Sequence, residues 1–407
     1  MISHLYPNST PALNFNFKSS GVADPRISCA RSTTGTYVDP ATGSIETAAA
    51  NEARVGRDGL LVEEARTNEQ TNSEDFANNS SWSMKNSYTR GSNTTEPAPD
   101  GTNTACEFFE VNGAGQFNGV KAASMYQITA TSGRLTVSVF NKPINNDTFM
   151  MMESDTTSGV ANCTSIINNT WQYNSSFVES ATAKPIGNGW YRMSATFIVP
   201  TSTQFYRPVF SSQMFSGPNE TPDATQGCTL WGAQVEEGAF VTSYIPTSSS
   251  TVTRNSDQLS FTTAGQLNTS ATADRTFTVI ATTDYVPAIE QKIISTDPRL
   301  FEPDFDVSSN AKTASIYTPF TTGMTLSNAP NTVNFVATVN STVARKAINY
   351  DTSQDTTRSS FHNSTFNTIW FGIYLNNTTF KPFSGHIERF SFYSTLMNLD
   401  EVKSLSI

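Results

Sequence analysis

The chain has 407 residues, a length at which a single hydrophobic core no longer grows, so two or three domains are expected. Its formal net charge of −10 at pH 7, with no cluster of Lys and Arg, argues against a nucleic-acid surface or an anionic-membrane surface. Hydrophobic residues make up 37%, aromatic residues 11% and charged residues only 15% of the chain, which favours strands and turns over helices. We therefore predict an all-β fold.

From the first residues of the sequence we expect no signal peptide. Residues 1–17 contain no basic region followed by an apolar run, and no stretch of the chain approaches the roughly 20 apolar residues that a membrane span needs. We expect a protein that is made in a cytoplasm, is not inserted in a membrane and remains soluble.

Residues 1–74 are too poor in apolar side chains to form a core of their own. Leu13, Phe15 and Phe17 alternate with polar residues, as in a short half-buried strand, and turn formers such as Asp24-Pro25 and Asp39-Pro40 follow. An extended arm with small hairpins is predicted. Such an arm is stable only when it docks on its own sandwich, on a sister subunit or on a larger assembly, and all three alternatives are left open.

Residues 75–247 are predicted to form a first β-sandwich. Short apolar runs recur between Gly, Asn and Pro, with no helical period of useful length, which indicates a jelly roll or sandwich rather than a βαβ fold. Asn188-Gly189 is a hairpin signal. After it, alternating residues should share one face, with Tyr191 and Phe197 on the same side of the strand and Arg192 on the other.

The stretch Leu230 to Thr247, LWGAQVEEGAFVTSYIPT, is expected to end this sandwich. Its aromatic residues and the turn former Gly238 predict a strand, a turn and a short second strand. Pro246 cannot donate to a ladder, and the Thr/Ser run that follows has nothing apolar to bury. The first sandwich should therefore stop at this point.

Residues 248–270 are predicted to be a polar connector, and residues 271–407 a second β-sandwich. The apolar interval in QLSFTT ends the first module or begins the next. The C-terminal strand that begins at Gly385 should run into a short helix over Asn398 to Leu405, with Asn398 or the neighbouring turn as its cap and Asp400 in its first turn. This end resembles that of laminin-G-like or concanavalin-like sandwiches.

A longer resemblance is carried by residues spread over the first two thirds of the chain. They are Arg26-Ile27, Arg31-Ser32, Thr36-Tyr37-Val38-Asp39, Gly43, Ile45, Ala48-Ala49, Asn51, Arg54, Gly59-Leu60-Leu61-Val62-Glu63 and Arg66-Thr67-Asn68, followed by WGAQVEEGAFVTSYIPT. The stretch from Asp24 to Arg254 resembles tailed-bacteriophage virion proteins, chiefly tail-fibre and appendage proteins, in which this run precedes a module similar to carbohydrate-binding jelly rolls. The resemblance implies a place on a phage particle more firmly than it implies an activity.

Four cysteines, Cys29, Cys106, Cys163 and Cys228, are widely spaced, and none forms a Cys-x-x-Cys or Cys/His pair. That spacing makes a metal site improbable and favours buried free thiols. A disulfide among the last three is an open alternative in an oxidising setting.

The sequence offers few combinations of residues that could form a catalytic site. The three histidines, His4, His362 and His386, have no nucleophile motif or metal-ligand partner at helical spacing. Carboxylate pairs such as Glu63-Glu64, Glu236-Glu237 and Asp304/Asp306 could serve a glycosidase, but adjacent strand residues face opposite ways and solvated pairs are far commoner. We expect no enzyme.

Glycan binding has a better physical case, because exposed aromatic faces pack against pyranose rings while amides and carboxylates bond their hydroxyls. Trp190 and Trp231 lie among core-like strand residues and are expected inside, whereas Trp82 remains a candidate. The glycan-binding candidates that we favour are Trp171, Tyr173, Tyr206, Trp370 and Tyr374. The resemblance also allows a structural calcium ion at a loop, although no acidic loop is specific enough to name ligands. No other cofactor is indicated.

The sequence thus predicts a non-enzymatic virion protein of a tailed phage. An N-terminal docking arm (1–74) would contact other virion proteins, and two sandwiches (75–247 and 271–407) would project outward and attach to host surface polysaccharide. A homo-oligomer, with a trimer favoured, would cover the sheet edges. The alternatives are a purely architectural protein, such as a capsid decoration or a tail adaptor, and a polysaccharide depolymerase, which would need a cleft with paired carboxylates.

Overall fold

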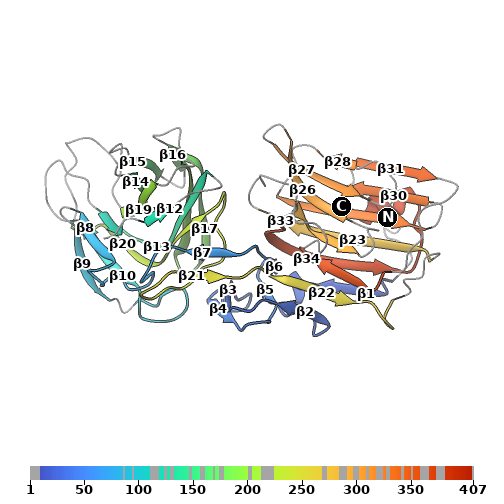
Figure 1. Ribbon diagram of the computed structural model, residues 1–407, viewed down its shortest axis with the longest axis horizontal. Helices are drawn as coiled ribbons and strands as arrows, with labels where there is room; N and C mark the ends of the chain where they lie inside the picture. Colours follow the sequence, from blue (N-terminus) through green and yellow to red (C-terminus); the bar gives the residue numbers. More distant parts are fainter. Residues whose placement is uncertain are drawn as a thin grey trace. The chain divides into compact units, whose positions relative to one another are not determined.

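The computed structural model is almost entirely β. It describes residues 10–85, 88–93, 96–110, 119–122, 126–128, 133–145, 149–155, 161–167, 170–173, 178–199, 204–211, 224–267, 273–283, 291–296, 302–308, 311–317, 324–326, 331–340, 343–349, 352–357, 366–372 and 381–405. Within these ranges there are 34 strands and two short helices (Figure 1). No helix among them is long and apolar enough to cross a membrane. The predicted all-β class is confirmed.

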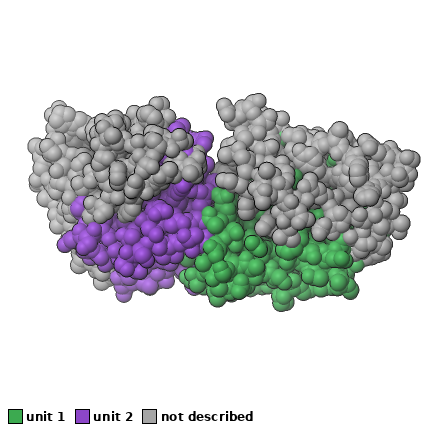
Figure 2. Space-filling view, in the orientation of Figure 1, with its two compact units in different colours: residues 1–41, 47–65, 255–407 green, residues 42–46, 66–254 purple. Residues whose placement is uncertain are grey.

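The chain folds into two compact units, coloured separately in Figure 2. Unit 1 contains residues 1–41, 47–65 and 255–407, and unit 2 contains residues 42–46 and 66–254. Unit 1 is therefore built from both ends of the chain, and most of unit 2 is inserted between its parts.

One layer of unit 1 is an eight-stranded sheet in the order β31-β30-β29-β23-β34-β6-β5, with β1 also paired to β34. Its strands are β1 (Leu13–Asn16), β5 (Arg54–Gly56), β6 (Gly59–Val62), β23 (Arg275–Thr282), β29 (Thr332–Val339), β30 (Val343–Ile348), β31 (Thr352–Thr357) and β34 (Gly385–Tyr393). The C-terminal strand β34 pairs with β1 at Phe390 and Phe392 and with β6 at Ile387. Strands from opposite ends of the chain thus hold this sheet together.

The other strands of unit 1 form two smaller sheets. The four-stranded sheet has the order β2-β22-β32-β25, with β2 (Ile27–Ala30), β22 (Gln258–Thr262), β32 (Thr368–Phe371) and β25 (Ile294–Thr296). The five-stranded sheet contains β28 (Met324–Leu326), β27 (Ala311–Tyr317), β26 (Glu302–Ser308), β24 (Gln291–Lys292) and β33 (Lys381–Pro382). One apolar core joins the eight-stranded and four-stranded sheets, because it contains Phe277 and Phe390 of the first and Phe261 and Phe371 of the second.

The two helices lie in unit 1. Helix α1 (Phe17–Ser20) follows β1 and buries Phe17, and helix α2 (Leu399–Leu405) buries Val402 on a small cluster with Val336 and Ala347. Asn398 caps α2: its side-chain oxygen accepts from the amides of Asp400 and Glu401, and the Glu401 carboxylate accepts from the Asn398 amide. The predicted C-terminal helix and its cap are confirmed.

Unit 2 contains a six-stranded sheet in the order β17-β18-β13-β20-β10-β9 and a seven-stranded sheet in the order β16-β15-β14-β19-β11-β8, with β12 also paired to β19. The first comprises β9 (Tyr88–Asn93), β10 (Cys106–Glu110), β13 (Arg134–Ile144), β17 (Val178–Gly187), β18 (Trp190–Ile198) and β20 (Gly227–Glu237). The second comprises β8 (Trp82–Lys85), β11 (Gly119–Ala122), β12 (Tyr126–Ile128), β14 (Phe149–Asp155), β15 (Ala161–Ile167), β16 (Thr170–Tyr173) and β19 (Gln204–Ser211). The core between them joins Trp82 and Phe210 to Phe108 and Phe197.

Four short strands complete the description. They are β3 (Gly35–Val38), β4 (Ile45–Ala48), β7 (Arg66–Asn68) and β21 (Val252–Arg254). Strands β7 and β21 pair with each other at the two ends of the inserted residues 66–254, with Arg66 opposite Arg254.

The N-terminal arm takes the first of the three arrangements that the sequence left open: it docks on its own sandwich. Strand β1 pairs with β34 and β2 pairs with β22, so most buried apolar side chains of residues 10–41 and 47–65 join a core made mostly by residues beyond 255. Ile45 instead packs in a core cluster of unit 2. The QLSFTT interval forms β22 and belongs to unit 1 rather than to a connector.

The structure confirms the predicted hairpin at Asn188-Gly189 but not the short second strand predicted after Gly238. Asn188 and Gly189 both have positive φ (51° and 79°) and join β17 to β18, as predicted. Strand β20 lies inside its sheet, between β13 and β10, and no strand is assigned between Gly238 and Thr251. The predicted short second strand is wrong, because buried side chains rather than a neighbouring strand accept the amides of that segment.

Candidate functional site

The five predicted glycan-binding residues are distributed over both units. Trp171 and Tyr173 lie in β16 and Tyr206 lies in β19, where the structure describes the backbone and not these side chains, and Tyr374 lies outside the described residues. Trp370 lies in β32 of unit 1, and its side chain is described. The candidate site is therefore built around Trp370.

Trp370 points away from the core of unit 1. Its neighbours Ile369 and Phe371 are fully buried in that core, and side chains alternate between the two faces of a strand. Trp370 itself is half-buried on the opposite face of the four-stranded sheet. An indole in this position presents the exposed part of its apolar surface outside that core.

Serine side chains stand beside Trp370 on both neighbouring strands. The register places Ser260 of β22 and Ser295 of β25 directly opposite Trp370, and Ser28 of β2 lies opposite Ser260. Ser260 and Ser28 share the face of the indole, because Leu259, Phe261 and Ile27 between and beside them are in the core. One row of side chains therefore crosses the sheet from β2 to β25, in the order Ser28, Ser260, Trp370, Ser295.

The row has one open end. Ser295 is 1% exposed, whereas Ser260 is half-buried and Ser28 is exposed. Thr262 and Thr368 form the adjacent pair in the register, and Gln258 lies on the other side of Ser260 along β22. We call the accessible residues the Trp370 face; it consists of Ser28, Gln258, Ser260, Thr262, Thr368 and Trp370.

The Trp370 face combines one aromatic ring with hydroxyl and amide groups and carries no ionisable side chain. A serine or threonine hydroxyl both donates and accepts a hydrogen bond, as a sugar hydroxyl does. An aromatic ring can pack against the apolar face of a pyranose while such groups bond its rim. The arrangement is suited to holding a polar, uncharged ring-shaped ligand and offers no group for acid–base catalysis.

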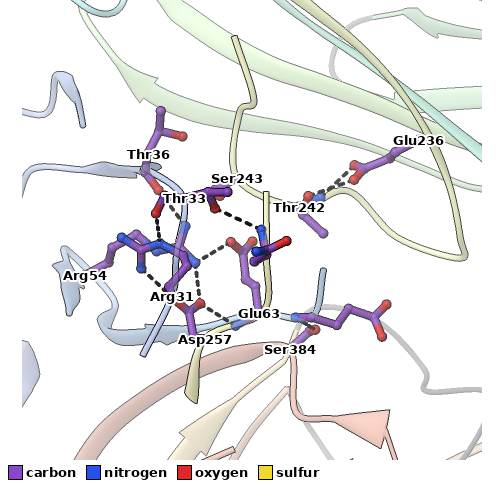
Figure 3. Close-up of polar contacts among 12 residues, drawn as sticks. Arg31, Thr33, Thr36, Arg54, Glu63, Glu236, Thr242, Ser243, Asp257 and Ser384 are labelled. Carbon is purple, nitrogen blue, oxygen red and sulfur yellow. Dashed lines mark hydrogen bonds and ion pairs between the residues drawn. The ribbon is translucent and has the colours of Figure 1, made fainter. Parts of the chain in front are cut away.

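A cluster of charged side chains is buried in unit 1, next to the start of β22. Asp257 precedes β22, and its carboxylate accepts from the Arg31 Nη1 at 2.7 Å, from the Arg54 Nη2 and from the Glu63 amide at 2.9 Å. Arg54 also pairs with the Glu63 carboxylate at 2.8 Å. Figure 3 shows these groups converging on Asp257 from strands and loops far apart in the sequence.

This four-residue cluster holds the fold together and is closed to a substrate. The side chains of Arg31, Arg54, Asp257 and Glu63 are between 0% and 6% exposed. Burial alone would lower the pKa of Arg54, but the adjacent carboxylates of Glu63 and Asp257 outweigh it and raise that pKa, so the guanidinium stays charged. Two positive and two negative groups balance, as buried charges require.

A second buried network lies in unit 2, within the stretch Leu230 to Thr247. The Glu236 carboxylate accepts from the Thr242 amide at 2.8 Å, the Thr242 hydroxyl at 2.7 Å and the Gln234 side chain at 3.1 Å. Gln234 in turn accepts the Ile245 amide at 2.8 Å. These side chains replace the ladder that a second strand would have made after Gly238.

Two aromatic residues of the same stretch, Trp231 and Tyr244, lie in a buried cluster. Tyr244 packs on Trp231 and Phe140, and the Arg192 guanidinium lies 4.3 Å from the centre of the Phe140 ring. Burial raises the pKa of Tyr244 well above its ordinary value, and burial also raises the pKa of Glu74, which accepts from the Tyr244 hydroxyl at 3.1 Å. The phenol therefore stays protonated and acts as a hydrogen-bonding core residue.

Three of the five tryptophans are core residues whose indole N–H groups are satisfied within the chain. Trp82, Trp190 and Trp231 are at most 2% exposed and donate to Asn72, Pro97 and Thr104, respectively. The prediction that Trp190 and Trp231 lie inside is confirmed. The candidate role of Trp82 in sugar binding is wrong, because its apolar neighbours Phe76 and Phe210 enclose it.

Two of the three carboxylate pairs differ from the expectation of solvated pairs, and the side chains of Asp304 and Asp306 in β26 lie outside the described ones. Glu63 and Glu236 are 5% and 0% exposed, whereas their neighbours Glu64 and Glu237 are half-buried. The alternation along the chain was predicted, but the burial was not, because the partners that stabilise each buried carboxylate come from distant segments.

Other titratable and metal-binding groups add no further centre in the described part of the chain. Cys29 is half-buried, Cys106 and Cys228 are buried, and His386 lies half-buried in β34. Among the residues that the structure describes, no group of three or more His, Cys, Asp and Glu side chains could hold a metal ion.

Comparison with known proteins gives similarity in strand arrangement alone. No family model matches the sequence, and no curated protein matches it. The LG1-3 region of the laminin alpha2 chain is 13% identical with a TM-score of 0.22, and covers 68% of this chain and 65% of that chain. A Trypanosoma rangeli sialidase is 9% identical with a TM-score of 0.29, and covers 74% of this chain and 60% of that chain.

A third solved structure is similar over one part of the chain. Domain 4 of AbnA, an extracellular arabinanase from Geobacillus stearothermophilus whose structure contains arabinotriose, is 10% identical with a TM-score of 0.28, and covers 42% of this chain and 83% of that chain. At such scores the three similarities carry no functional argument, and the inference about function depends on the residues of the Trp370 face.

Proposed function

We propose that the protein is a non-catalytic glycan-binding protein that attaches a tailed phage to host surface polysaccharide. One observation carries the glycan-binding part: Trp370 is half-buried on the outer face of a sheet, and the other described side chains that share this face on β2, β22, β25 and β32 are uncharged and mostly hydroxyl or amide groups. The indole supplies the apolar platform and Ser28, Ser260 and Gln258 supply the hydrogen bonds.

The non-catalytic part of the proposal is supported by the position of the carboxylates. A glycosidase needs two carboxylates that reach the substrate from opposite sides of the scissile bond. Glu63, Asp257 and Glu236 are enclosed by arginine, amide and hydroxyl partners, and the Trp370 face contains no carboxylate. These groups are occupied in stabilising the fold.

Display on a phage particle is supported by the resemblance of residues 24–254 to virion proteins. The motif residues Arg31, Arg54, Glu63, Gln234 and Glu236 make the two buried networks, so the resemblance concerns the framework of the two units. Such a framework can carry different surfaces. On this basis we place the protein on the virion, as a homo-oligomer for which a trimer is favoured.

Multiple copies would compensate for a shallow site. An aromatic contact contributes only about 0.5–1.5 kcal/mol beyond area burial, so one Trp370 face should bind weakly. Linking several such faces on one particle can raise the overall affinity by about 10²–10⁴-fold without a new contact. A flat face with one platform is therefore sufficient for attachment.

The test is binding of the labelled full-length protein to host cells, with host surface polysaccharide as competitor. We expect saturable binding that the polysaccharide abolishes and that Trp370→Ala weakens about tenfold per site. Ile280→Ala is the matched control, since Ile280 is a half-buried apolar residue between core residues Val279 and Ala281 and so lies on the outer face of the other layer of unit 1. Shortening of the competitor during the assay would instead indicate an enzyme.

Docking to other virion proteins through residues 1–74 needs a point substitution rather than a truncation. Removing the segment would delete β1, β2, β5 and β6 from the sheets of unit 1. Val22 is a large apolar side chain of this segment that is 67% exposed, so Val22→Asp should reduce incorporation into particles if docking occurs there, without unfolding unit 1. Incorporation at the unaltered level would contradict docking at this point.

The architectural alternative has its own supporting observation, namely that Trp82, Trp190 and Trp231 are all core residues. If a folded, oligomeric protein binds neither host cells nor polysaccharide, the protein is architectural and Trp370 only covers the four-stranded sheet.

A further inference from the structure

The Trp370 face has a direction and a charge state that restrict what it can hold. Its row across the sheet is closed at Ser295, which is 1% exposed, and open through Ser260 to Ser28. A ligand stacked on Trp370 can therefore extend toward β22 and β2 and not toward β25. Neighbouring strands lie about 4.8 Å apart, so the row from Trp370 to Ser28 spans roughly 10 Å, which is comparable with a disaccharide.

The face is electrically neutral along all four strands. The side chains that alternate with the core are Ser28, Ala30, Gln258, Ser260, Thr262, Ser295, Thr368 and Trp370. None of them can ionise at neutral pH. A carboxylate placed here would lose water without gaining a cationic partner, which is unfavourable.

The arginines nearest to these strands in sequence are committed elsewhere. Arg26 pairs with Asp24 through two contacts of 2.8 Å, and its guanidinium lies over the rings of Phe15 and Phe261, which belong to the core. Arg31 is fully buried against Asp257. Neither is available to an anionic ligand on the Trp370 face.

The net charge of the whole chain also disfavours anionic ligands. At −10 it repels polyanions, and this repulsion is strongest at low ionic strength, where screening extends farther. Uncharged polysaccharides are not affected. Local and global electrostatics therefore select the same class of ligand.

We propose that the Trp370 face takes an uncharged stretch of glycan that lies across β32, β22 and β2, with one sugar ring stacked on Trp370 and the next within reach of Ser260 and Ser28. This inference rests on the proposed glycan-binding function and adds the class of sugar, the direction of the chain and the two residues that read it. Each serine hydroxyl can donate to one sugar hydroxyl or accept from it.

The experiment measures affinities of the full-length protein for uncharged oligosaccharides of glucose, galactose and mannose and for oligosaccharides that contain sialic acid or uronic acid. Titration calorimetry at low and at physiological salt gives the affinities. We expect an uncharged disaccharide to bind more tightly than its monosaccharide, and all acidic oligosaccharides to bind more weakly.

Three variants test the geometry. Ser260→Ala and Ser28→Ala should each lower the affinity for the disaccharide about two- to tenfold, the range expected for one neutral hydrogen bond, and should leave the monosaccharide affinity unchanged. Thr332→Ala is the matched control, because Thr332 is an exposed hydroxyl residue on β29 in the other layer. Ser28→Lys should raise the affinity for a uronic-acid oligosaccharide about two- to fivefold at low salt.

The possible outcomes distinguish a failure of this inference from a failure of the proposed glycan-binding function. Tighter binding of an acidic oligosaccharide that depends on Trp370, or unchanged disaccharide affinity in both serine variants, would overturn the neutral, directional site and leave glycan binding intact. Failure of every saccharide and of host polysaccharide to bind, or binding that survives Trp370→Ala, would overturn the proposed function itself. Unaltered thermal unfolding of each variant shows that the fold is retained.

Discussion

Replacing Asp257 by asparagine should strongly destabilise unit 1, because Asp257 is the centre of the buried cluster of Arg31, Arg54 and Glu63. The cluster has two positive and two negative side chains, all at most 6% exposed. The side-chain amide of the Asp257→Asn variant would keep the shape and could still accept from the Glu63 amide, but it would leave one uncompensated positive charge in the interior. Removing one partner of a buried ion pair costs about 3–5 kcal/mol.

The magnitude can be converted into a melting temperature. For a unit of about 200 residues, 1 kcal/mol corresponds to about 2–4 °C, so Asp257→Asn should lower the melting temperature of unit 1 by roughly 6–20 °C in calorimetry. Lys18→Met is the control. Lys18 pairs with Glu388 at 2.9 Å but is 50% exposed, and such a surface pair is worth about 0–1 kcal/mol.

A double variant tests the charge argument separately from the loss of hydrogen bonds. Arg31→Met combined with Asp257→Asn removes one charge of each sign and leaves the Arg54–Glu63 pair, at 2.8 Å, balanced. The double variant should therefore be less destabilised than the sum of the single variants. Additive losses, or a shift for Asp257→Asn no larger than that of Lys18→Met, would refute the reasoning.

For two further variants, the structure determines whether the free energy of unfolding rises or falls. Burial lowers the pKa of Lys346 to about 8, so between pH 8 and 10.5 the unfolded state binds more protons and the free energy of unfolding rises with pH. Lys346→Met should remove this slope in urea unfolding and stabilise unit 1 at pH 7 by about 1–3 kcal/mol, whereas an unchanged slope would contradict the assignment. Gly59 has φ of 116°, and a Cβ there would lie 2.6 Å from the backbone oxygen of Ile387, which cannot move aside easily, so Gly59→Ala should cost more than the about 1–3 kcal/mol of backbone strain alone. Gly101→Ala, at φ of 82° with open space around it, should show only the strain in thermal unfolding, and equal losses would argue against the steric term.

Local patterns predicted those elements whose partners are close in the sequence. The Asn188-Gly189 turn and the C-terminal cap at Asn398 are set by residues within a few positions of each other, and both are present. The alternation of β18 also followed from its own residues: Met193, Ala195 and Phe197 are in the core. Period-two patterns report a strand wherever it lies, because the alternation of side chains is local.

Partners far apart in the sequence account for the expectations that changed. Residues 10–65 contain too few apolar side chains for a core, yet Phe15 packs on Phe261 and Phe390, more than 240 positions away. Glu236 is a buried carboxylate because Thr242 turns back to it, which a strand–turn–strand pattern does not predict. Trp82 is enclosed by Phe210 of a different strand.

The candidate site shows the same division. The sequence by itself determined the all-β class, the Asn188-Gly189 turn and the alternation that turns Trp370 away from Ile369 and Phe371. Only the tertiary structure decided that Ser260 and Ser28 lie in one row with Trp370, because the pairing of β2, β22 and β32 joins segments separated by more than 100 residues. Strand register across such distances depends on which side chains share the core, and that is a property of the folded chain as a whole.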